Sequence, residues 1–353
     1  LVQAAESEFS REQFGRLVMP NITSTAVRHW LDQQFDAAGR LRLNVLAIEL
    51  TEAKNGVSRL HARVCDFKDA SGERVKFHAV TNGIDLSTWV LPEILDAYFR
   101  KGIIDKFELV TEDYAGRILE FSGREIRELK QLARAKANEI LATRKDQNGA
   151  SLQIPDDAIV FDFKRRFADY KRPWMPFERV DELKNILTEY NAHFILAGKV
   201  WLGDTRMYMN LQEILKLIEG DDVLRERVHY VQDYDEALGK ALAFGSDVAI
   251  NVPIIGLEAC GTSWEKDIAN LKLLVSTADG GVADVSPLAC YDVVGATYED
   301  EVTSLYEQMR SAATALRDDS LLEKAIHKQL IGYLPIVSGA RMMKEYLRFL
   351  FDK

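Results

Sequence analysis

Hydrophobic and polar residues follow two different rhythms along this chain, and the change comes near residue 150. Beyond it, short apolar runs alternate with amphipathic stretches. The apolar runs that predict strands are AIVFDF (158–163), HFILAG (193–198), RVHYV (227–231), DVAINV (247–252) and LKLLVST (271–277). Strands that alternate with helices build parallel sheets covered on both faces. The pattern over residues 155–330 therefore predicts an α/β fold with a doubly wound parallel sheet.

The flanking segments have helical spacing instead. Helices are predicted to dominate residues 92–146, where one face carries Ile126, Leu129, Leu132 and Ile140. A last helix is predicted over residues 336–353, with one face formed by Met342, Tyr346, Leu347 and Leu350. These patterns divide the chain into a mostly helical portion (1–150), a sheet domain (151–335) and a C-terminal helix (336–353).

Composition and charge narrow the possible partners. The formal net charge of −10 argues against a nucleic-acid backbone as a general partner. Three widely spaced cysteines, without a CxxC motif, indicate a reducing cytoplasm. No apolar run approaches the roughly 20 residues of a membrane span. His61 has no second histidine at ligand spacing, so no metal site is expected.

A basic loop follows the first strand candidate. The stretch KRRFADYKR (164–172) carries five cations in an acidic protein. Ligands of parallel sheets bind at the carboxyl ends of the strands, and this loop lies at such an end. Arg166 and Lys171 could reach one phosphate from its first turn, because Arg offers a planar fork and Lys a compact charge. The alternative is a basic edge that only faces solvent.

The stretch GLEACGTSWEK (256–266) follows the fourth strand candidate. Gly261 allows a close backbone approach, and Thr262 and Ser263 can cap a helix and leave N–H groups for an anion. Lys266, one turn in, could form a Schiff base with an aldehyde cofactor. The alternative is a capped surface helix with an inert lysine. Tyr234, after the third strand candidate, could donate to a phosphate or simply pack.

Two geometric expectations follow from this placement. Both loops leave one edge of the sheet, so the charged groups of Arg165, Arg166 and Lys171 should converge near the turn at 261–263. Lys266 should face a cavity between the basic loop and the capped helix. Burial and neighbouring cations would then lower its pKa and favour the neutral amine.

Seven blocks, in order, resemble the α-glucan phosphorylases, which include glycogen and maltodextrin phosphorylase. The blocks are KNGVSRLHARV, VTNGIDLSTWVLPE, RRFADYKR, AGKVWLGD, EACGTSWEK, STADGG and GARMMKEY. The resemblance covers about residues 42–353. It implies the C-terminal half of a GT-B glycosyltransferase, with a Rossmann-like cofactor domain at 151–335. Residues 1–150 would be what remains of the catalytic core and interdomain helices.

The resemblance also implies a reaction, which is phosphorolysis of α-1,4-glucan to glucose 1-phosphate. Pyridoxal phosphate would be bound as a Schiff base to Lys266, and its phosphate would act as acid and base. The residues implied near the cofactor phosphate are Arg165, Gly261, Thr262, Ser263 and Tyr234. Those implied at the substrate are Arg166 and Lys171 for phosphate, and Asn55 and Glu258 for the sugar, with Tyr170 nearby. The expected partners are α-glucan and inorganic phosphate, and a homodimer is the assembly considered.

Departures from the family pattern keep two other functions open. The family's Gly-Met before the lysine is Trp264-Glu265 here, a bulky ring and a carboxylate beside the expected cofactor. The family's N-terminal half has no counterpart in these 353 residues, which implies either a fragment or a divergent relative. The alternatives are a non-catalytic relative that binds glucan or anions, and a nucleotide-sugar glycosyltransferase that uses the basic loop without pyridoxal.

Overall fold

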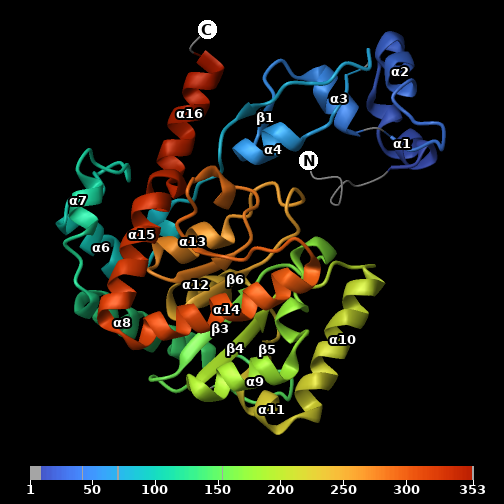
Figure 1. The fold of residues 1–353 in the computed structure, drawn as a ribbon. Coiled ribbons are helices and arrows are strands. Elements are labelled where there is room, and N and C mark those ends of the chain that lie inside the picture. Colours follow the sequence, from blue (N-terminus) through green and yellow to red (C-terminus); the bar gives the residue numbers. More distant parts are fainter. Residues whose placement is uncertain (1–8, 42, 70, 153, 352–353) are drawn as a thin grey trace.

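A six-stranded parallel sheet forms the centre of the computed structural model, which describes residues 9–41, 43–69, 71–152 and 154–351 (Figure 1). The strands are β3 (Ile159–Lys164), β4 (Ala192–Ala197), β5 (Val228–Val231), β6 (Val248–Asn251), β7 (Leu273–Ser276) and β8 (Tyr291–Asp292). They pair in the order β5-β4-β3-β6-β7-β8. The parallel sheet is confirmed, and its first five strands lie within two residues of the predicted bounds. The two-residue strand β8 was not predicted, because it has no apolar run.

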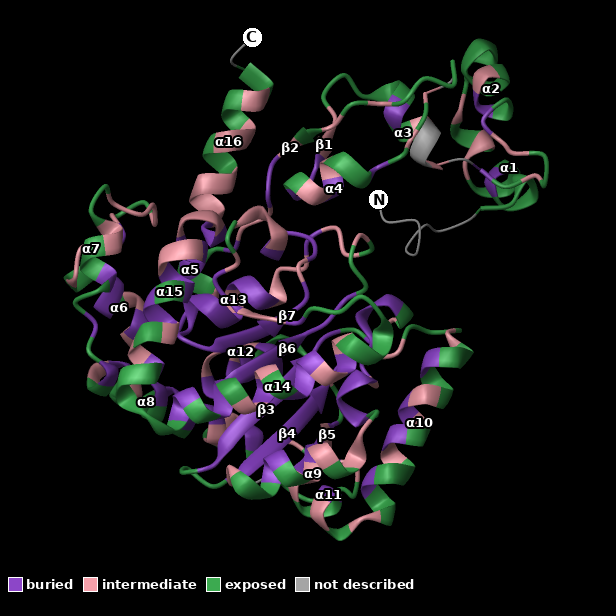
Figure 2. Ribbon diagram, viewed as in Figure 1, coloured by how far each residue is buried: buried purple, intermediate pink, exposed green. Residues whose placement is uncertain are grey.

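Both faces of the sheet are buried, which explains why the strands read as continuous apolar runs. Alternate side chains enter different apolar clusters. Phe161 and Phe194 belong to the large cluster, whereas Val160 and Ile195 belong to a smaller one with Leu238. Figure 2 shows the strands buried between helices. The helices around the sheet are α9 (Val180–Glu189), α10 (Thr205–Gly220), α11 (Asp222–Arg227), α12 (Glu236–Gly245), α13 (Ser263–Ala269), α14 (Tyr298–Arg317) and α15 (Asp319–Val337).

The segment before the sheet is mostly helical, as predicted. Its later helices are α5 (Leu86–Trp89), α6 (Pro92–Arg100), α7 (Tyr114–Ile118) and α8 (Gly123–Leu141), and α8 packs against α12 and α15. The earlier elements form an N-terminal lobe, set apart in Figure 1. They are α1 (Arg11–Leu17), α2 (Thr25–Asp32), α3 (Leu43–Leu50), β1 (Asn55–Gly56), α4 (Arg59–Val64) and β2 (His78–Ala79). This lobe has its own small core around Phe14, Leu31 and Leu41.

The predicted C-terminal helix differs in its boundaries. Helix α15 continues to Val337, and a separate helix α16 (Gly339–Phe351) follows; residues 352–353 lie outside the described part of the chain. The break has a tertiary cause, because Ile84 donates to the carbonyl of Val337 (2.7 Å) and Gly339 donates to that of Ile84 (2.6 Å). A Cβ on Gly339 would lie 3.0 Å from the Ile84 carbonyl oxygen, so the close approach favours glycine there.

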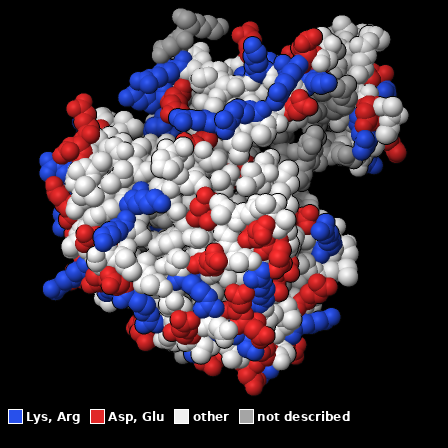
Figure 3. Space-filling model, viewed as in Figure 1, with Lys and Arg blue, Asp and Glu red and all other residues white. Residues whose placement is uncertain are grey.

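Helix α16 has no buried residue among those described, and its apolar side chains Met343, Leu347, Leu350 and Phe351 are exposed (Figure 2). Figure 3 shows acidic and basic side chains interspersed over the sheet domain, with Lys and Arg gathered near α16 and the N-terminal lobe. Within the described ranges, no helix is long and apolar enough to cross a bilayer.

A stacked histidine pair lies buried between two neighbouring strands. His193 of β4 and His229 of β5 have ring centroids 5.2 Å apart, and Nδ1 of His193 lies 2.9 Å from Nε2 of His229. Burial lowers the pKa of each imidazole to about 4, helped by the charge of Arg227 beside His193 and by the paired ring beside His229. Both rings are therefore neutral at pH 7.

This pair should make the fold sensitive to mild acid. Unfolded histidine has a pKa of about 6.5. Between about pH 6.5 and 4, the unfolded chain therefore binds protons that the folded chain does not bind. The free energy of unfolding should therefore fall as the pH is lowered through that window. His229→Gln should flatten the slope by up to about 1.4 kcal/mol per pH unit. Denaturant unfolding at a series of pH values measures it, with the exposed His29→Gln as control; an unchanged slope in His229→Gln would contradict the assignment.

Candidate functional site

Three loops meet at the carboxyl edge of the sheet, after β3, β6 and β7. Because β3 and β6 are paired neighbours, the loops that follow them also lie side by side. The amide of Ile254 donates to the Tyr170 carbonyl (2.8 Å), which ties the β6 loop to the basic loop. Thr277 donates through its hydroxyl to the Pro253 carbonyl (2.7 Å), which ties the β7 loop to the β6 loop.

The centre of this edge is a buried ion cluster, which we call the Glu258 cluster (Arg165, Lys171 and Glu258). Oε2 of Glu258 accepts from Nη2 of Arg165 and from Nζ of Lys171, each at 2.6 Å. All three side chains are at most a tenth exposed. A Cβ on Gly261 would lie 2.6 Å from the Arg165 Nη2, so glycine permits this approach. The structure thus brings Arg165, Lys171 and Gly261 together.

The electrostatics of the Glu258 cluster are those of two cations that share one anion. Burial, and then the charge of Arg165, lower the pKa of Lys171 to about 7, although Glu258 opposes this. Burial acts to raise the pKa of Glu258, but Arg165 and Lys171 outweigh it, so the pKa lies below its usual value. Nη1 of Arg165 is buried and has no hydrogen-bond partner among the described residues. The cluster therefore keeps one unused buried donor.

Arg166 does not join the two cations on Glu258, contrary to the expected convergence of three. Burial, and then Glu258, raise the pKa of Tyr170. Arg166 is exposed, and its charge lies close enough to the Tyr170 hydroxyl to oppose the rise of that pKa. Consecutive side chains near a strand end point to opposite sides, so an inward Arg165 leaves Arg166 on the outside. Arg166 remains close enough for its charge to contribute to the lowered pKa of Lys171.

Asp279 holds the β6 loop in place, a role that the sequence analysis missed. Its Oδ1 accepts from the amides of Gly256 (2.9 Å) and Gly280 (2.8 Å), and its Oδ2 accepts from the amide of Glu258 (2.8 Å). Asp279 is 2 % exposed. The available signal was an acidic residue two positions after the fifth strand candidate, at the same edge of the sheet. These three hydrogen bonds from backbone amides to one carboxylate fix the backbone position of Glu258.

The helix that carries Lys266 has an open N-terminus. Thr262 is the N-cap residue of α13, but its side chain accepts no capping hydrogen bond, so the expected capping is wrong for Thr262. Among the described residues, neither the Thr262 nor the Ser263 hydroxyl has a hydrogen bond. Nζ of Lys266 lies 3.1 Å from the ring centroid of Trp89 in α5. Lys266 thus contacts an indole face that the sequence analysis missed, and the cavity beside the basic loop stays a prediction.

Lys266 is half-buried, and its surroundings change its chemistry. Burial, and then the charge of Lys164, lower the pKa of Lys266 to about 8, while Asp267 and Glu265 act in the other direction. A considerable fraction of this amine is therefore neutral near pH 7.5, which is the form that attacks an aldehyde. The direction of the shift agrees with the expectation from its neighbours.

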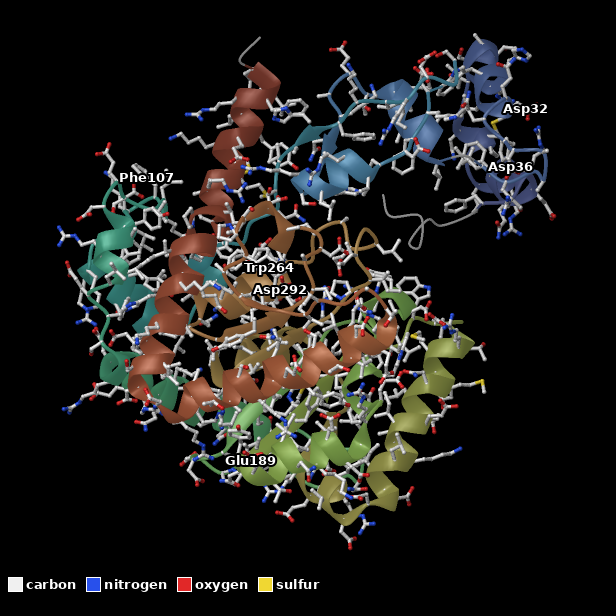
Figure 4. All side chains as sticks on the ribbon, in the orientation of Figure 1. Asp32, Asp36, Phe107, Glu189, Trp264 and Asp292 are labelled. Atoms are coloured by element: carbon white, nitrogen blue, oxygen red, sulfur yellow. The ribbon has the colours of Figure 1, made fainter. Side chains whose placement is uncertain are left out.

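The two unusual residues before Lys266 are part of the core. Trp264 is buried and packs edge-on against Tyr333, with ring centroids 5.3 Å apart; Figure 4 labels it inside the fold. Glu265 is fully buried, and Sγ of Cys260 donates to its Oε1 (3.5 Å). Burial raises the pKa of Glu265 to about 8, so the group is mostly neutral at pH 7. The bulky ring is thus used in packing, and the carboxyl adds little charge beside Lys266.

Asn55 and Tyr234 lie outside the Glu258 cluster. Asn55 donates through Nδ2 to the hydroxyl of Tyr346 in α16 (2.8 Å). A different asparagine reaches the β6 loop, since Nδ2 of Asn82 donates to the carbonyl of Cys260 (3.1 Å). Asn82 belongs to the TNG turn that the sequence analysis quoted without assigning a role. Burial, and then Asp162 and Asp267, raise the pKa of the half-buried Tyr234 to about 12, so its hydroxyl is a donor.

A second buried ion cluster, which links β3 with α13, was also missed. Nζ of Lys272 lies 2.5 Å from Asp162 and 3.2 Å from Asp267, and Lys164 pairs with Asp267 as well. Lys164, although part of the basic loop, is therefore committed to a structural pair. Buried charges persist only when they are paired, so this cluster fixes the position of β3 relative to α13.

Comparison with known protein families identifies the family to which this chain belongs. A family model described as carbohydrate phosphorylase matches residues 19–347. The chain belongs to the carbohydrate phosphorylase family. The matched region contains the three loops, the Glu258 cluster and α13. Family membership thus agrees with the resemblance of the seven sequence blocks.

Curated relatives agree with this assignment at low identity. The glycogen phosphorylase of Aquifex aeolicus is 27 % identical, over 88 % of this chain and 49 % of the relative. The maltodextrin phosphorylase of Thermococcus litoralis is 26 % identical, over 68 % of this chain and 31 % of the relative. The glycogen phosphorylase of Mycobacterium tuberculosis is 25 % identical, over 69 % and 30 %. This member of the family spans about half the length of its relatives, or less.

The loop-holding role of Asp279 predicts a graded loss of stability. Asp279→Ala removes the acceptor of three amides and should lower the free energy of unfolding by about 3 kcal/mol. Asp279→Asn keeps one acceptor oxygen and should lose less. Denaturant unfolding of both variants measures the series, with the exposed Asp181→Asn as control. Equal and small effects of Ala and Asn would show that the carboxylate does not hold the loop.

Proposed function

We propose that this chain is the C-terminal half of an α-glucan phosphorylase-type glycosyltransferase. The proposed reaction transfers a glucosyl unit from α-1,4-glucan to inorganic phosphate and forms glucose 1-phosphate, with pyridoxal phosphate as cofactor. The observation that carries the proposal is the Glu258 cluster, two buried cations at the carboxyl edge of a parallel sheet in a member of this family. Buried ion pairs add little net stability, and two cations on one carboxylate leave a net positive charge that suits an anionic ligand.

The architecture supports the same proposal. Strand order runs outward in both directions from the β3–β6 pair, so the topology reverses at the place where the basic loop and the β6 loop meet. Ligands of doubly wound sheets bind at such a switch point. We therefore assign residues 151–335 to a Rossmann-like cofactor domain of GT-B type, and residues 1–150 to the catalytic core and interdomain helices.

The residues around α13 fit pyridoxal phosphate. Lys266 offers an amine with a lowered pKa that could tether the aldehyde. Thr262 and Ser263 offer hydroxyls without partners among the described residues, and Arg165 offers its unused Nη1 donor for a phosphate. Burial of Trp264 and Glu265 supports the fit, since neither the ring nor a charged carboxylate competes for that space. When bound, the cofactor would supply a phosphate group that acts as acid and base.

The chain's own residues would position the substrates. Inorganic phosphate would be held by Lys171, by the exposed Arg166 beside it, and by Nη2 of Arg165, which shares the Glu258 oxygen with Lys171. Glu258 would accept hydrogen bonds from sugar hydroxyls, and Tyr170 would lie next to the sugar. Burial of the cluster lowers the local dielectric, which strengthens each of these contacts. Because the chain spans about half the length of its relatives, glucan turnover is proposed for a protein that supplies the remaining length as well.

Covalent capture of the cofactor tests this proposal without any assay of turnover. The protein is incubated with pyridoxal phosphate, reduced with borohydride and mapped by peptide mass spectrometry. The label should fall on Lys266 and should be lost in Lys266→Ala. Lys240→Ala is the matched control, since Nζ of Lys240 also lies over the Trp89 ring, at 5.3 Å.

Two results would contradict the cofactor site. Label scattered over surface lysines would favour the non-catalytic relative that binds glucan or anions. Equal loss of label in Lys240→Ala and Lys266→Ala would mean that the indole face, and no specific lysine, selects the aldehyde.

A further inference from the structure

The anion site of the Glu258 cluster already contains an anion, the protein's own carboxylate. A single oxygen, Oε2 of Glu258, accepts from both Arg165 and Lys171 at 2.6 Å. Any phosphate that uses these two donors must compete with that oxygen. Binding of phosphate is therefore an exchange of anions, and the free energy that it gains is offset by the loss of two buried ion pairs.

Arg165 and Lys171 have more N–H donors than one carboxylate oxygen can accept. Arg165 is 6 % exposed, and its Nη1 has no partner among the described residues. Buried donors are nearly always paired in folded proteins, so Nη1 is available to an oxygen of a ligand or of water. A tetrahedral oxyanion has four acceptor oxygens and could give separate oxygens to Nη2 and Nζ, which leaves Nη1 for the cofactor phosphate. Phosphate or sulfate could thus offer the two donors separate oxygens, whereas Glu258 offers them a single one.

The displacement requires only a side-chain movement. Asp279 holds the amides of Gly256 and Glu258. Asn82 donates to the carbonyl of Cys260, so the backbone of the β6 loop is fixed before and after the side chain that moves. Rotation about the side-chain torsions of Glu258 would carry its carboxylate between staggered positions. No loop closure is needed.

We propose that the carboxylate of Glu258 is an internal occupant of the oxyanion site when no ligand is bound. Phosphate and a sugar hydroxyl then displace this carboxylate together. Phosphate takes the place of the carboxylate on Arg165 and Lys171, and the released carboxylate accepts hydrogen bonds from the sugar. Each ligand then favours the other, because each stabilises the same position of Glu258. The inference rests on the proposed phosphate and sugar sites, and it adds their coupling.

Sulfate is the probe, because it stays a dianion at pH 6.0, where Lys171 is largely protonated. Its affinity is measured by titration calorimetry on the full chain. Glu258→Gln removes the competing charge and should bind sulfate about tenfold more tightly than the parent protein. Glu301→Gln is the matched control: Glu301 pairs with Arg172 of the same basic loop, outside the Glu258 cluster, so sulfate affinity should stay within twofold of the parent.

A second titration tests the coupling. Saturating maltotriose should raise the sulfate affinity of the parent protein several-fold and should not change that of Glu258→Gln. If Glu258→Gln does not fold, Glu258→Asp replaces it, because a shorter carboxylate withdraws from both cations and should also bind sulfate more tightly.

The failures are distinguishable. If parent and Glu258→Gln bind sulfate equally, or the variant binds it more weakly, the internal-occupant inference is wrong while the oxyanion site stands. If neither protein binds sulfate, the site itself is wrong, and the phosphate part of the proposed function falls with it. Capture of pyridoxal phosphate on Lys266 is independent of both results.

Discussion

The rest of the site depends on one interaction, in which two buried cations share the Oε2 atom of Glu258. Arg165 and Lys171 come from the loop after β3, and Glu258 comes from the loop after β6. Neither cation could remain buried without this anion or a substitute for it. The loop architecture follows from the same requirement, since Asp279 fixes the backbone at Glu258 and Gly261 makes room for the guanidinium. A site that needs a counter-anion when empty is prepared to bind one.

The sheet could be predicted from sequence for a physical reason. Strands buried on both faces must be apolar throughout, and five such runs separated by helical stretches leave few alternatives. The C-terminal helix was predicted with the wrong start, because the break at Ser338 comes from pairing with Ile84, some 250 residues away in sequence. Local periodicity contains no information about such a contact.

The sequence predicted which loops form the candidate site, but it predicted only some of the contacts between their side chains. Placement at the carboxyl edge was enough to bring Arg165 and Lys171 together near Gly261. Side-chain direction was not available from the sequence, so the outward position of Arg166 and the contact of Lys266 with an indole were missed. Glu258 was expected to contact a sugar, and its role as counter-ion depends on exact distances across two loops.

Direct titration of Lys171 tests the central claim, that two cations lie buried on one carboxylate. Reductive methylation with ¹³C-formaldehyde makes each lysine visible by NMR, and Lys171→Met assigns the signal. The account predicts one lysine with a pKa of about 7, because burial and the adjacent Arg165 disfavour the ammonium form. A Lys171 signal that titrates at the ordinary value of about 10.4 would contradict the buried cluster.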